Sequence, residues 1–309
     1  MELLKALEGI RSPFWDTVVG LITRLGEETI GVVILCLIFW CISKRFAYII
    51  GVAFFLSGLT VQGMKICFRI DRPWVIDPEF NPVEGAKEYA TGYSFPSGHT
   101  QSAASLYGAI GAQVKQKWLM AVCFIIPVLV AFSRLYLGVH TLLDVTVSLA
   151  ICFIFIFLTL KIFSGDGAVN KKRELIISLS MIIYACVVIV IAVVLHSNGT
   201  IEKHYAADAL KAAGACIGFA AGMYIERVYI DFPVKAKNLL WQAIKLVIGI
   251  AGVLIIQNGF KEIFKLIFGA DNLFADTLRY FLMLSWVTLF YPLIIKRFFS
   301  DTGGRFSVS

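Results

Sequence analysis

Three short clusters of charged, titratable and small residues in the first half of the chain each flank a hydrophobic segment. They are Lys65…Arg72-Pro73, Pro96-Ser97-Gly98-His99 and Ser133-Arg134…His140…Asp144. Ionisable side chains are unfavourable within a bilayer, so cations, histidines and a carboxylate gathered at the ends of apolar segments require a functional reason. The residue types are those that bind and transfer a phosphoryl group. The sequence therefore indicates a phosphate-handling site at a membrane surface.

The second cluster predicts an anion site at a helix start. Ser97 directly precedes a helix of small residues and is expected to cap it, which leaves the amides of Gly98 and His99 pointing outward. Free amides and the partial positive charge of a helix N-terminus suit a phosphate. Charge-assisted hydrogen bonds would be added by the nearby cations Lys65, Arg72 and Arg134. This set predicts a dianionic ligand.

The third cluster predicts a nucleophile. His140 and Asp144 stand four residues apart at the start of a helix, so they share a face and the carboxylate can fix the imidazole tautomer. An oriented neutral imidazole can attack phosphorus in line. The second histidine, His99, would protonate the leaving oxygen and later activate water on the phosphohistidine. The predicted catalytic residues are therefore His140, His99 and Asp144.

Metal-assisted chemistry is the alternative, because many phosphatases use divalent ions held by carboxylates. The acidic residues near the clusters lie in the connecting loop, and none pairs with a histidine at ligand spacing. They are Asp71, Asp77, Glu79, Glu84 and Glu88. We expect neither a metal nor a cofactor.

The three clusters resemble the signature of the type 2 phosphatidic acid phosphatase superfamily: Lys-x6-Arg-Pro, Pro-Ser-Gly-His and Ser-Arg-x5-His-x3-Asp. The resemblance covers residues 29–164 and implies metal-independent hydrolysis of a phosphomonoester or diphosphate. It implies His140 as nucleophile, His99 as general acid and Asp144 as the partner of His140. The phosphate-binding residues that it implies are Lys65, Arg72, Ser97, Gly98 and Arg134.

Composition predicts an all-α, polytopic membrane bundle. The 309 residues are 59% hydrophobic and only 16% charged, with a mean hydropathy of +0.81, which is outside the range of soluble domains. The apolar runs are continuous and approach the length of a spanning helix, unlike the short alternating segments of a barrel. About nine membrane helices are expected, near residues 29–43, 46–64, 97–114, 117–137, 140–163, 175–195, 208–226, 239–260 and 278–298.

Five segments follow from this pattern. Residues 1–28 alternate apolar and charged positions, which favours an interfacial or re-entrant segment. The resemblance implies that residues 29–164 form the lipid phosphatase catalytic core. A cytoplasmic linker at 165–174 leads to a C-terminal transmembrane helical domain at 175–298, and residues 299–309 form a cytoplasmic tail.

The net charge of +7 comes from basic residues scattered over short loops, not from a stripe that would bind nucleic acid. Taking alternate loops, these residues fall on one side, which the positive-inside rule assigns to the cytoplasm. The three clusters fall on the other. We expect an integral protein of a bacterial cytoplasmic membrane with its active site outside the cytoplasm. Cysteine spacing supports neither a disulfide framework nor a zinc site.

Several features have two interpretations. Gly214, Gly218 and Gly222 form a ridge that favours packing within the chain over a homodimer. Charged residues of the second half either snorkel or form a second anionic-lipid pocket, and we expect Lys245 to pair with Glu226. The aromatic residues between the first two clusters favour an interfacial belt over a lipid-gripping lid; they are Trp74, Phe80, Tyr89, Tyr93 and Phe95.

The predicted function is hydrolysis of a membrane lipid phosphate or diphosphate at the extracytoplasmic face, through a phosphohistidine. Undecaprenyl diphosphate, phosphatidic acid and phosphatidylglycerol phosphate all fit, with recycling of a cell-envelope carrier as the first choice. Two alternatives stay open: phosphoryl transfer to a lipid or sugar hydroxyl, and a lipid transporter or scramblase whose first half only binds phosphate.

Overall fold

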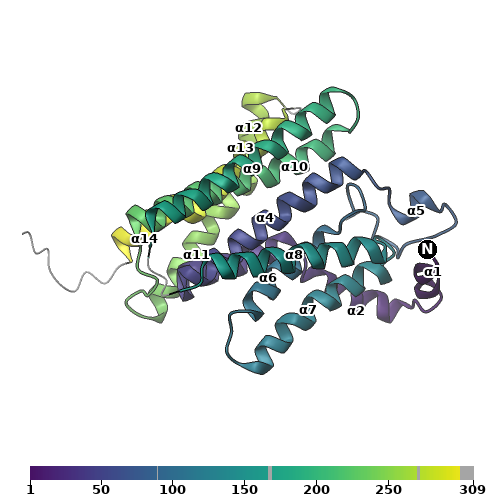
Figure 1. The fold of residues 1–309 in the computed structure, drawn as a ribbon, viewed down its shortest axis with the longest axis horizontal. Helices are drawn as coiled ribbons and strands as arrows, with labels where there is room; N and C mark the ends of the chain where they lie inside the picture. Colours follow the sequence, from purple (N-terminus) through teal and green to yellow (C-terminus); the bar gives the residue numbers. More distant parts are fainter. Residues whose placement is uncertain (89, 166–168, 270–271, 300–309) are drawn as a thin grey trace, which may run out of the picture.

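The computed structural model describes residues 1–88, 90–165, 169–269 and 272–299, and every regular element in these residues is a helix (Figure 1). The α-helices are α1 (Glu2–Glu8), α2 (Pro13–Arg24), α3 (Glu28–Leu37), α4 (Lys44–Phe68), α5 (Pro73–Ile76), α6 (Gly98–Gly111), α7 (Lys117–Tyr136), α8 (Leu142–Ile162), α9 (Lys171–Ser197), α10 (Lys203–Ile225), α11 (Leu239–Leu254), α12 (Phe260–Phe268), α13 (Leu273–Ser285) and α14 (Tyr291–Phe298). Wider π-helical turns follow four of them: η1 (Ile38–Ile42), η2 (Glu226–Ile230), η3 (Ile255–Gly259) and η4 (Trp286–Phe290).

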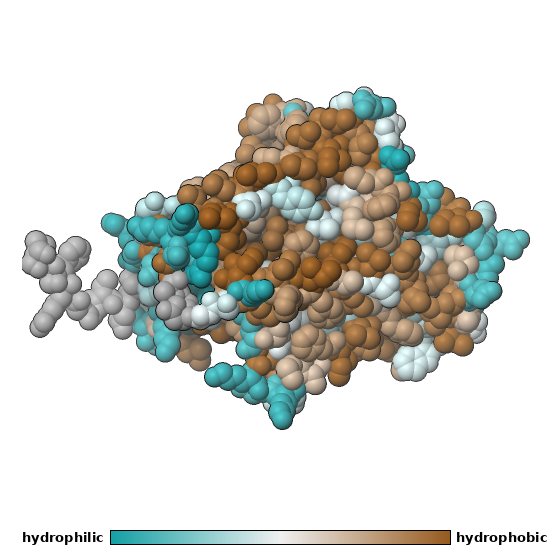
Figure 2. All heavy atoms as spheres, in the orientation of Figure 1, coloured by the Kyte–Doolittle hydropathy of each residue, from teal (hydrophilic) through white to brown (hydrophobic). Residues whose placement is uncertain are grey.

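Six spans within the described residues are long and apolar enough to cross a membrane. They are Lys44–Ile76, Lys117–Tyr136, Leu142–Ile162, Lys171–Ser197, Leu239–Phe268 and Leu273–Phe298. A seventh would arise if Pro13–Arg24 and Glu28–Ile42, which are bent by 45°, form one span. The all-helical membrane fold is confirmed, whereas the count of nine is not. Figure 2 shows the hydrophobic surface across the middle of the molecule, with hydrophilic residues gathered towards its ends.

Two predicted membrane helices, α6 and α10, fall outside these spans because they are interior helices. α6 has only 14 residues, and small and hydroxyl side chains such as Ser102 and Ser105 are buried along it. α10 buries alanines and glycines against its neighbours, and its first half carries Asp208 and Lys211. A helix surrounded by other helices does not need an apolar surface towards lipid, so neither has the hydropathy of a lipid-facing span.

The N-terminal segment packs on the catalytic half. α1 and α2 lie along α7, and Leu4 and Leu7 are buried in a small cluster with Ala131 and Leu135. Together with the 45° bend between α2 and α3, this is the geometry of a broken span or a re-entrant loop. Residues 1–28 are therefore part of the wall around the other helices.

The two halves share one hydrophobic core. A single buried cluster extends from Leu35 to Phe299 and draws on both the predicted catalytic core and the predicted C-terminal domain. α10 lies against α4, α9 and α13, and the rings of Phe55 and Phe219 are 4.7 Å apart across the α4–α10 contact. Of the predicted linker, residues 166–168 lie outside the described residues, and α9 begins at Lys171. Residues 300–309 of the predicted tail also lie outside them.

The glycine ridge is buried inside the chain. A Cβ at Gly214 or Gly218 would collide with the backbone oxygen of Thr277 or Phe281 on α13, and a Cβ at Gly222 would collide with Thr288. The glycines thus allow α10 and α13 to approach closely, as small residues do at membrane helix interfaces. A homodimer through this ridge is not supported, because α13 and η4 already occupy that face.

The start of α4 and the end of α10 meet at the end of the bundle opposite α1 and α5 (Figure 1). There Lys44 Nζ lies 3.0 Å from Glu226 Oε1, and Arg227 lies 3.1 Å from Glu174. The predicted Lys245–Glu226 pair is wrong. The Lys245 ammonium instead donates to the backbone oxygen of Val234 at 2.6 Å, because Glu226 ends α10 on the side facing α4, where Lys44 and Tyr48 reach it.

Candidate active site

Residues of all three predicted clusters line one cavity of about 340 Å³. Lys65 ends α4, Arg72 immediately precedes α5, His99 stands in the first turn of α6, Arg134 in the last turn of α7, and His140 in the loop before α8. Gly98 also lines the cavity. The volume lies within the usual range of small-molecule sites, roughly 300–1,000 Å³. Segments up to 75 residues apart in the sequence thus converge on one space.

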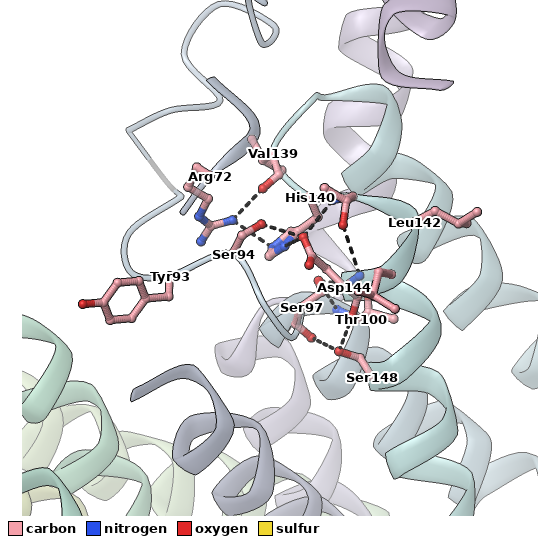
Figure 3. A network of polar contacts seen from close by, with 12 residues as sticks. Arg72, Tyr93, Ser94, Ser97, Thr100, Val139, His140, Leu142, Asp144 and Ser148 are labelled. Atoms are coloured by element: carbon pink, nitrogen blue, oxygen red, sulfur yellow. Dashed lines mark hydrogen bonds and ion pairs between the residues drawn. The ribbon is translucent and has the colours of Figure 1, made fainter. Parts of the chain in front are cut away.

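His140 is held at both ring nitrogens (Figure 3). Its side chain is 2% exposed. Nδ1 lies 3.3 Å from Asp144 Oδ2, and Nε2 lies 3.0 Å from the Arg72 guanidinium. Arginine can only donate, so Nε2 must accept and the ring proton must sit on Nδ1, facing Asp144. The Nε2 lone pair, the one that a nucleophile needs, is therefore free of a proton.

Burial lowers the pKa of His140 well below its ordinary value, and the positive charges of Arg72, Arg134 and Lys65 lower that pKa further. Both effects act against the imidazolium. At neutral pH the ring is consequently neutral, which agrees with the tautomer fixed by Arg72 and Asp144.

Asp144 is anchored by the first turn of α8 and by one residue from a distant loop. It forms a reciprocal capping box with Thr141, whose amide donates to Oδ2 at 2.7 Å. The hydroxyl of Ser94 donates to the same oxygen at 2.5 Å. Three donors from Ser94, Thr141 and His140 therefore meet at one carboxylate oxygen, which fixes the carboxylate in position. Sequence reasoning missed Ser94, which lies in an irregular loop without a periodic signal.

Arg72 is fixed by the backbone. Its guanidinium donates to the carbonyl oxygens of Thr91 and Gly92, each at 2.9 Å, and of Val139 at 2.7 Å. Together with the contact to His140, these bonds tie Arg72 to two loops at once (Figure 3). A lysine has one point of attachment and cannot reproduce this geometry.

Arg134 and Lys65 each have N–H donors that are left over for a ligand. Arg134 is 3% exposed and donates to Thr23 Oγ1 on α2 at 2.8 Å, whereas its buried Nε–H has no hydrogen-bond partner among the described residues. A buried charged donor without a partner is costly, so an anion in the cavity would relieve it. The Lys65 ammonium bonds to the carbonyl oxygen of Tyr93 at 2.6 Å and has two further N–H donors.

Ser97 caps α6, as predicted. Its hydroxyl accepts from the amide and the hydroxyl of Thr100, its amide donates to the backbone oxygen of Asp144 at 3.1 Å, and its side chain is fully buried. The cap therefore uses the hydroxyl that was expected to contact phosphate. In contrast, His99 lines the cavity, and within the described residues its ring has no hydrogen bond.

The belt predicted for the loop aromatic residues is wrong for Phe80 and Phe95, which are buried inside the protein. Tyr93 stacks on Tyr205 of α10 with centroids 3.9 Å apart, and it points away from His140 (Figure 3). Tyr89 lies outside the described residues. These rings hold the loop against the helices instead of marking a membrane interface.

Within the described residues, no three histidine, cysteine, aspartate or glutamate side chains gather as metal ligands. The cavity does, however, include side chains that sequence reasoning did not assign to it: Glu28, Tyr205, Asp208, Lys211 and Tyr280. All but Glu28 belong to the C-terminal half. Nothing in the local sequence around these residues indicates a site.

Comparison with known proteins shows the family of this chain. Residues 46–168 match the PAP2 superfamily, and residues 210–302 match the transmembrane extension of PAP2 superfamily phosphatases. Phosphatidylglycerophosphatase B of Bacillus subtilis (strain 168) is 32% identical over 161 residues, which cover 46% of this chain and 71% of that protein.

A solved structure is also similar: the crystal structure of the first transmembrane PAP2 type phosphatidylglycerolphosphate phosphatase from Bacillus subtilis. The TM-score is 0.44 at 27% identity, covering 51% of this chain and 81% of the other. The family match and the identity to the curated relative lead to one conclusion: this chain belongs to the PAP2 superfamily and is an integral membrane enzyme of the lipid phosphatase class.

Proposed function

We propose that this enzyme removes the phosphate from a membrane lipid phosphate without a metal ion, through a phosphohistidine on His140. The observation that supports this most directly is the arrangement of His140. Its Nε2 is unprotonated, buried and next to a cavity that Lys65, Arg72 and Arg134 line with positive charge.

In the first step the phosphate dianion binds among these cations. Arg72 gives up its hydrogen bond to Nε2 and donates to a phosphoryl oxygen instead. The Nε2 lone pair attacks phosphorus, an N–P bond forms, and the ester P–O bond breaks. Asp144 stabilises the positive charge that develops on the ring. His99 gives its proton to the leaving lipid oxygen; the bound phosphate favours the protonated form of His99 by placing negative charge beside it.

In the second step His99, now neutral, accepts a proton from water as the water oxygen attacks phosphorus. The N–P bond breaks, its electron pair returns to Nε2, and inorganic phosphate leaves. The residues are thereby restored to their starting protonation. Water is the only co-reactant, and no step requires a redox partner.

Two observations support a lipid class: the side chains that line the cavity and the name of the curated relative. The cavity extends from the cationic end to apolar side chains such as Phe55 and Met283, which suits a phosphate joined to an acyl lipid. The curated relative is named a phosphatidylglycerophosphatase, so phosphatidylglycerol phosphate is the first substrate to test, before phosphatidic acid and undecaprenyl diphosphate. Because the basic loops lie at the opposite end, the site is proposed to face outside the cytoplasm, in a bacterial cytoplasmic membrane.

Phosphate release by the purified protein tests the proposal. We expect release from at least one of the three lipids in the presence of a chelator, and loss of release in His140→Ala. Quenching during turnover should trap acid-labile, base-stable phosphate on the protein. Release only with added metal would overturn the mechanism. Phosphate that appears on an added hydroxyl acceptor would indicate a transferase, and no release at all would favour a transporter.

A further inference from the structure

The cavity that holds the catalytic residues has a second polar wall, which comes mainly from the C-terminal half. Asp208 and Lys211 of α10 and Tyr280 of α13 line it, together with Glu28 at the start of α3. The phosphate-binding cations and this wall therefore enclose the same 340 Å³ of space. Whatever is bound through its phosphate must present its neighbouring atoms to this second wall.

Glu28 is the least explained member of the wall. Its side chain is accessible from the cavity, and among the described residues it forms neither a hydrogen bond nor an ion pair. Asp208 and Lys211 lie within its electrostatic reach. Glu28 is exposed and lines the cavity, so its carboxylate oxygens are available to accept from a donor on a ligand.

The other members combine donors and acceptors. Lys211 Nζ lies 3.0 Å from Asp208 and 3.8 Å from Asp276, so its charge is shared between two carboxylates. Asp208 keeps free lone pairs beyond that single contact. The hydroxyl of Tyr280 has no hydrogen bond among the described residues, and it can donate or accept.

The charges on the wall restrict what it can bind. Two carboxylates against one ammonium disfavour a second phosphate bonded directly to the first, which is where a diphosphate would place it against this wall. The Lys211 ammonium in turn disfavours a cationic headgroup. A neutral group with free hydroxyls satisfies both, because hydroxyls donate to the carboxylates and accept from Lys211 or Tyr280.

We propose that Glu28, Asp208, Lys211 and Tyr280 bind a hydroxyl-bearing, glycerol-like group on the lipid side of the scissile phosphate, so that the C-terminal extension determines substrate specificity. The inference rests on the proposed phosphatase function and adds the headgroup that the enzyme selects. It also gives the extension a role in catalysis, because without α10 and α13 one wall of the cavity would be missing.

The test compares two lipids with the same acyl chains: phosphatidylglycerol phosphate, which has a glycerol next to the phosphate to be removed, and phosphatidic acid, which lacks that headgroup. The glycerol of the first lipid has one free hydroxyl, which donates to one carboxylate. At least one of Asp208→Asn and Glu28→Gln should therefore lower kcat/KM on that lipid about tenfold, the loss expected for a hydrogen bond to a charged group. Both should leave kcat/KM on the second lipid unchanged. Tyr280→Phe, which removes only a hydroxyl, should act in the same direction.

Inhibition by inorganic phosphate provides the internal control, because this ion occupies only the catalytic end. Its Ki should be the same in wild type and in the variants. Glu202→Gln removes a carboxylate that is exposed just before α10 and outside the cavity, and it should change none of the values. Equal losses on both lipids, a raised Ki for phosphate, or no loss on either lipid would overturn the inference. If wild type releases no phosphate from any lipid, the proposed function itself fails.

Discussion

His140 lies between two neighbours of opposite charge, and each controls a different ring nitrogen. Asp144 faces Nδ1 at 3.3 Å, and Arg72 faces Nε2 at 3.0 Å. Asp144 favours the tautomer with a proton on Nδ1, and Arg72 opposes any proton on Nε2. In the proposed mechanism, the cation that binds the substrate therefore also keeps the nucleophile deprotonated before the substrate arrives.

Asp144→Asn should lower kcat by about a hundredfold or more while KM changes little, because the amide cannot balance the charge that develops on His140 during attack. The phosphate contacts of Arg72, Arg134 and Lys65 are left in place. Steady-state kinetics on the lipid substrate measures both constants. Ser94→Ala removes one donor from the same carboxylate and should have a smaller effect on kcat. Wild-type turnover in Asp144→Asn would exclude Asp144 from the mechanism.

The lowered pKa of His140 predicts its titration. A base whose pKa is lowered by burial and by nearby cations stays neutral until the pH is well below the ordinary value of about 6.5. Nuclear magnetic resonance of labelled histidine side chains, with His140→Ala to assign the signal, should show the neutral ring throughout the range above pH 6.5. In Lys65→Met the midpoint should move to higher pH, because one opposing positive charge is gone. A wild-type midpoint at or above 6.5 would contradict this account.

At the scale of elements, the loop between α5 and α6 links the catalytic helices to the extension. Tyr93 in this loop stacks on Tyr205 of α10, while the carbonyl oxygens of Tyr93 and Gly92 accept from Lys65 and Arg72. One aromatic contact between the halves thus supports two of the cations at the phosphate end. This loop has little regular secondary structure, so side-chain contacts of this kind must hold it in place.

Tyr205→Ala should lower kcat/KM roughly threefold to tenfold, which corresponds to the loss of one stacked aromatic pair. Tyr205→Phe keeps the ring and should retain near wild-type activity. The comparison separates stacking from any role of the hydroxyl. If the alanine variant were fully active, the stack would not support the phosphate site.

A buried carboxylate, that of Glu226, joins the N-terminal end of α4 to the C-terminal end of α10. Glu226 is 0% exposed and accepts from Lys44 at 3.0 Å, from the Tyr48 hydroxyl and from the Phe232 amide at 3.2 Å. Removing one member of such a group leaves the others buried without their partner. This cluster holds the two halves together at the end far from the site.

Glu226→Gln should therefore lower the free energy of unfolding by about 3 kcal/mol or more, with kcat of the folded fraction unchanged. Denaturant unfolding in detergent, followed by activity per folded molecule, measures both. The matched control is Asp231→Asn, since Asp231 is the other partner of Lys44 but its side chain is 82% exposed. The control should lose less than about 1 kcal/mol. Equal losses in the two variants would argue against a buried, structural role for Glu226.

On the scale of the whole molecule, the proposed catalytic site and the basic loops lie at opposite ends of the bundle. The start of α8, next to the proposed nucleophile, lies at the end with α1 and α5, whereas the start of α4 and the end of α10 lie at the other end (Figure 1). One continuous hydrophobic core contains residues of both halves. The two halves are therefore held in a fixed position relative to each other. The proposed orientation of the active site therefore depends on the basic loops of the entire chain.

Cys67 offers a direct measurement of that face. It is exposed, next to the end of α4 and two residues from Lys65. A membrane-impermeant maleimide should label it in sealed vesicles whose extracytoplasmic surface faces the medium, and Cys67→Ser should abolish that signal. Cys186 is also exposed but lies in the middle of α9, away from water. Labelling of Cys67 only in inverted vesicles would reverse the proposed orientation.

The sequence alone determined the helical class and predicted the chemistry of the phosphate end. His140 and Asp144 are linked by a local i, i+4 relation, and Asp144 is held by a local capping box with Thr141. The cap at Ser97 is also local, and long apolar runs in a bilayer form helices. Local rules of this kind do not depend on where other helices lie.

Tertiary structure alone decided which distant residues complete the site and which charges meet. Ser94, Thr23 and the wall of α10 and α13 reach the cavity through contacts between segments far apart in sequence, and Glu226 pairs with Lys44 instead of Lys245 for the same reason. Helix periodicity tells which residues share a face, but not which neighbour that face meets. The neighbour is selected by packing of the whole bundle, where buried helices such as α6 and α10 no longer carry the hydropathy that predicts a membrane span.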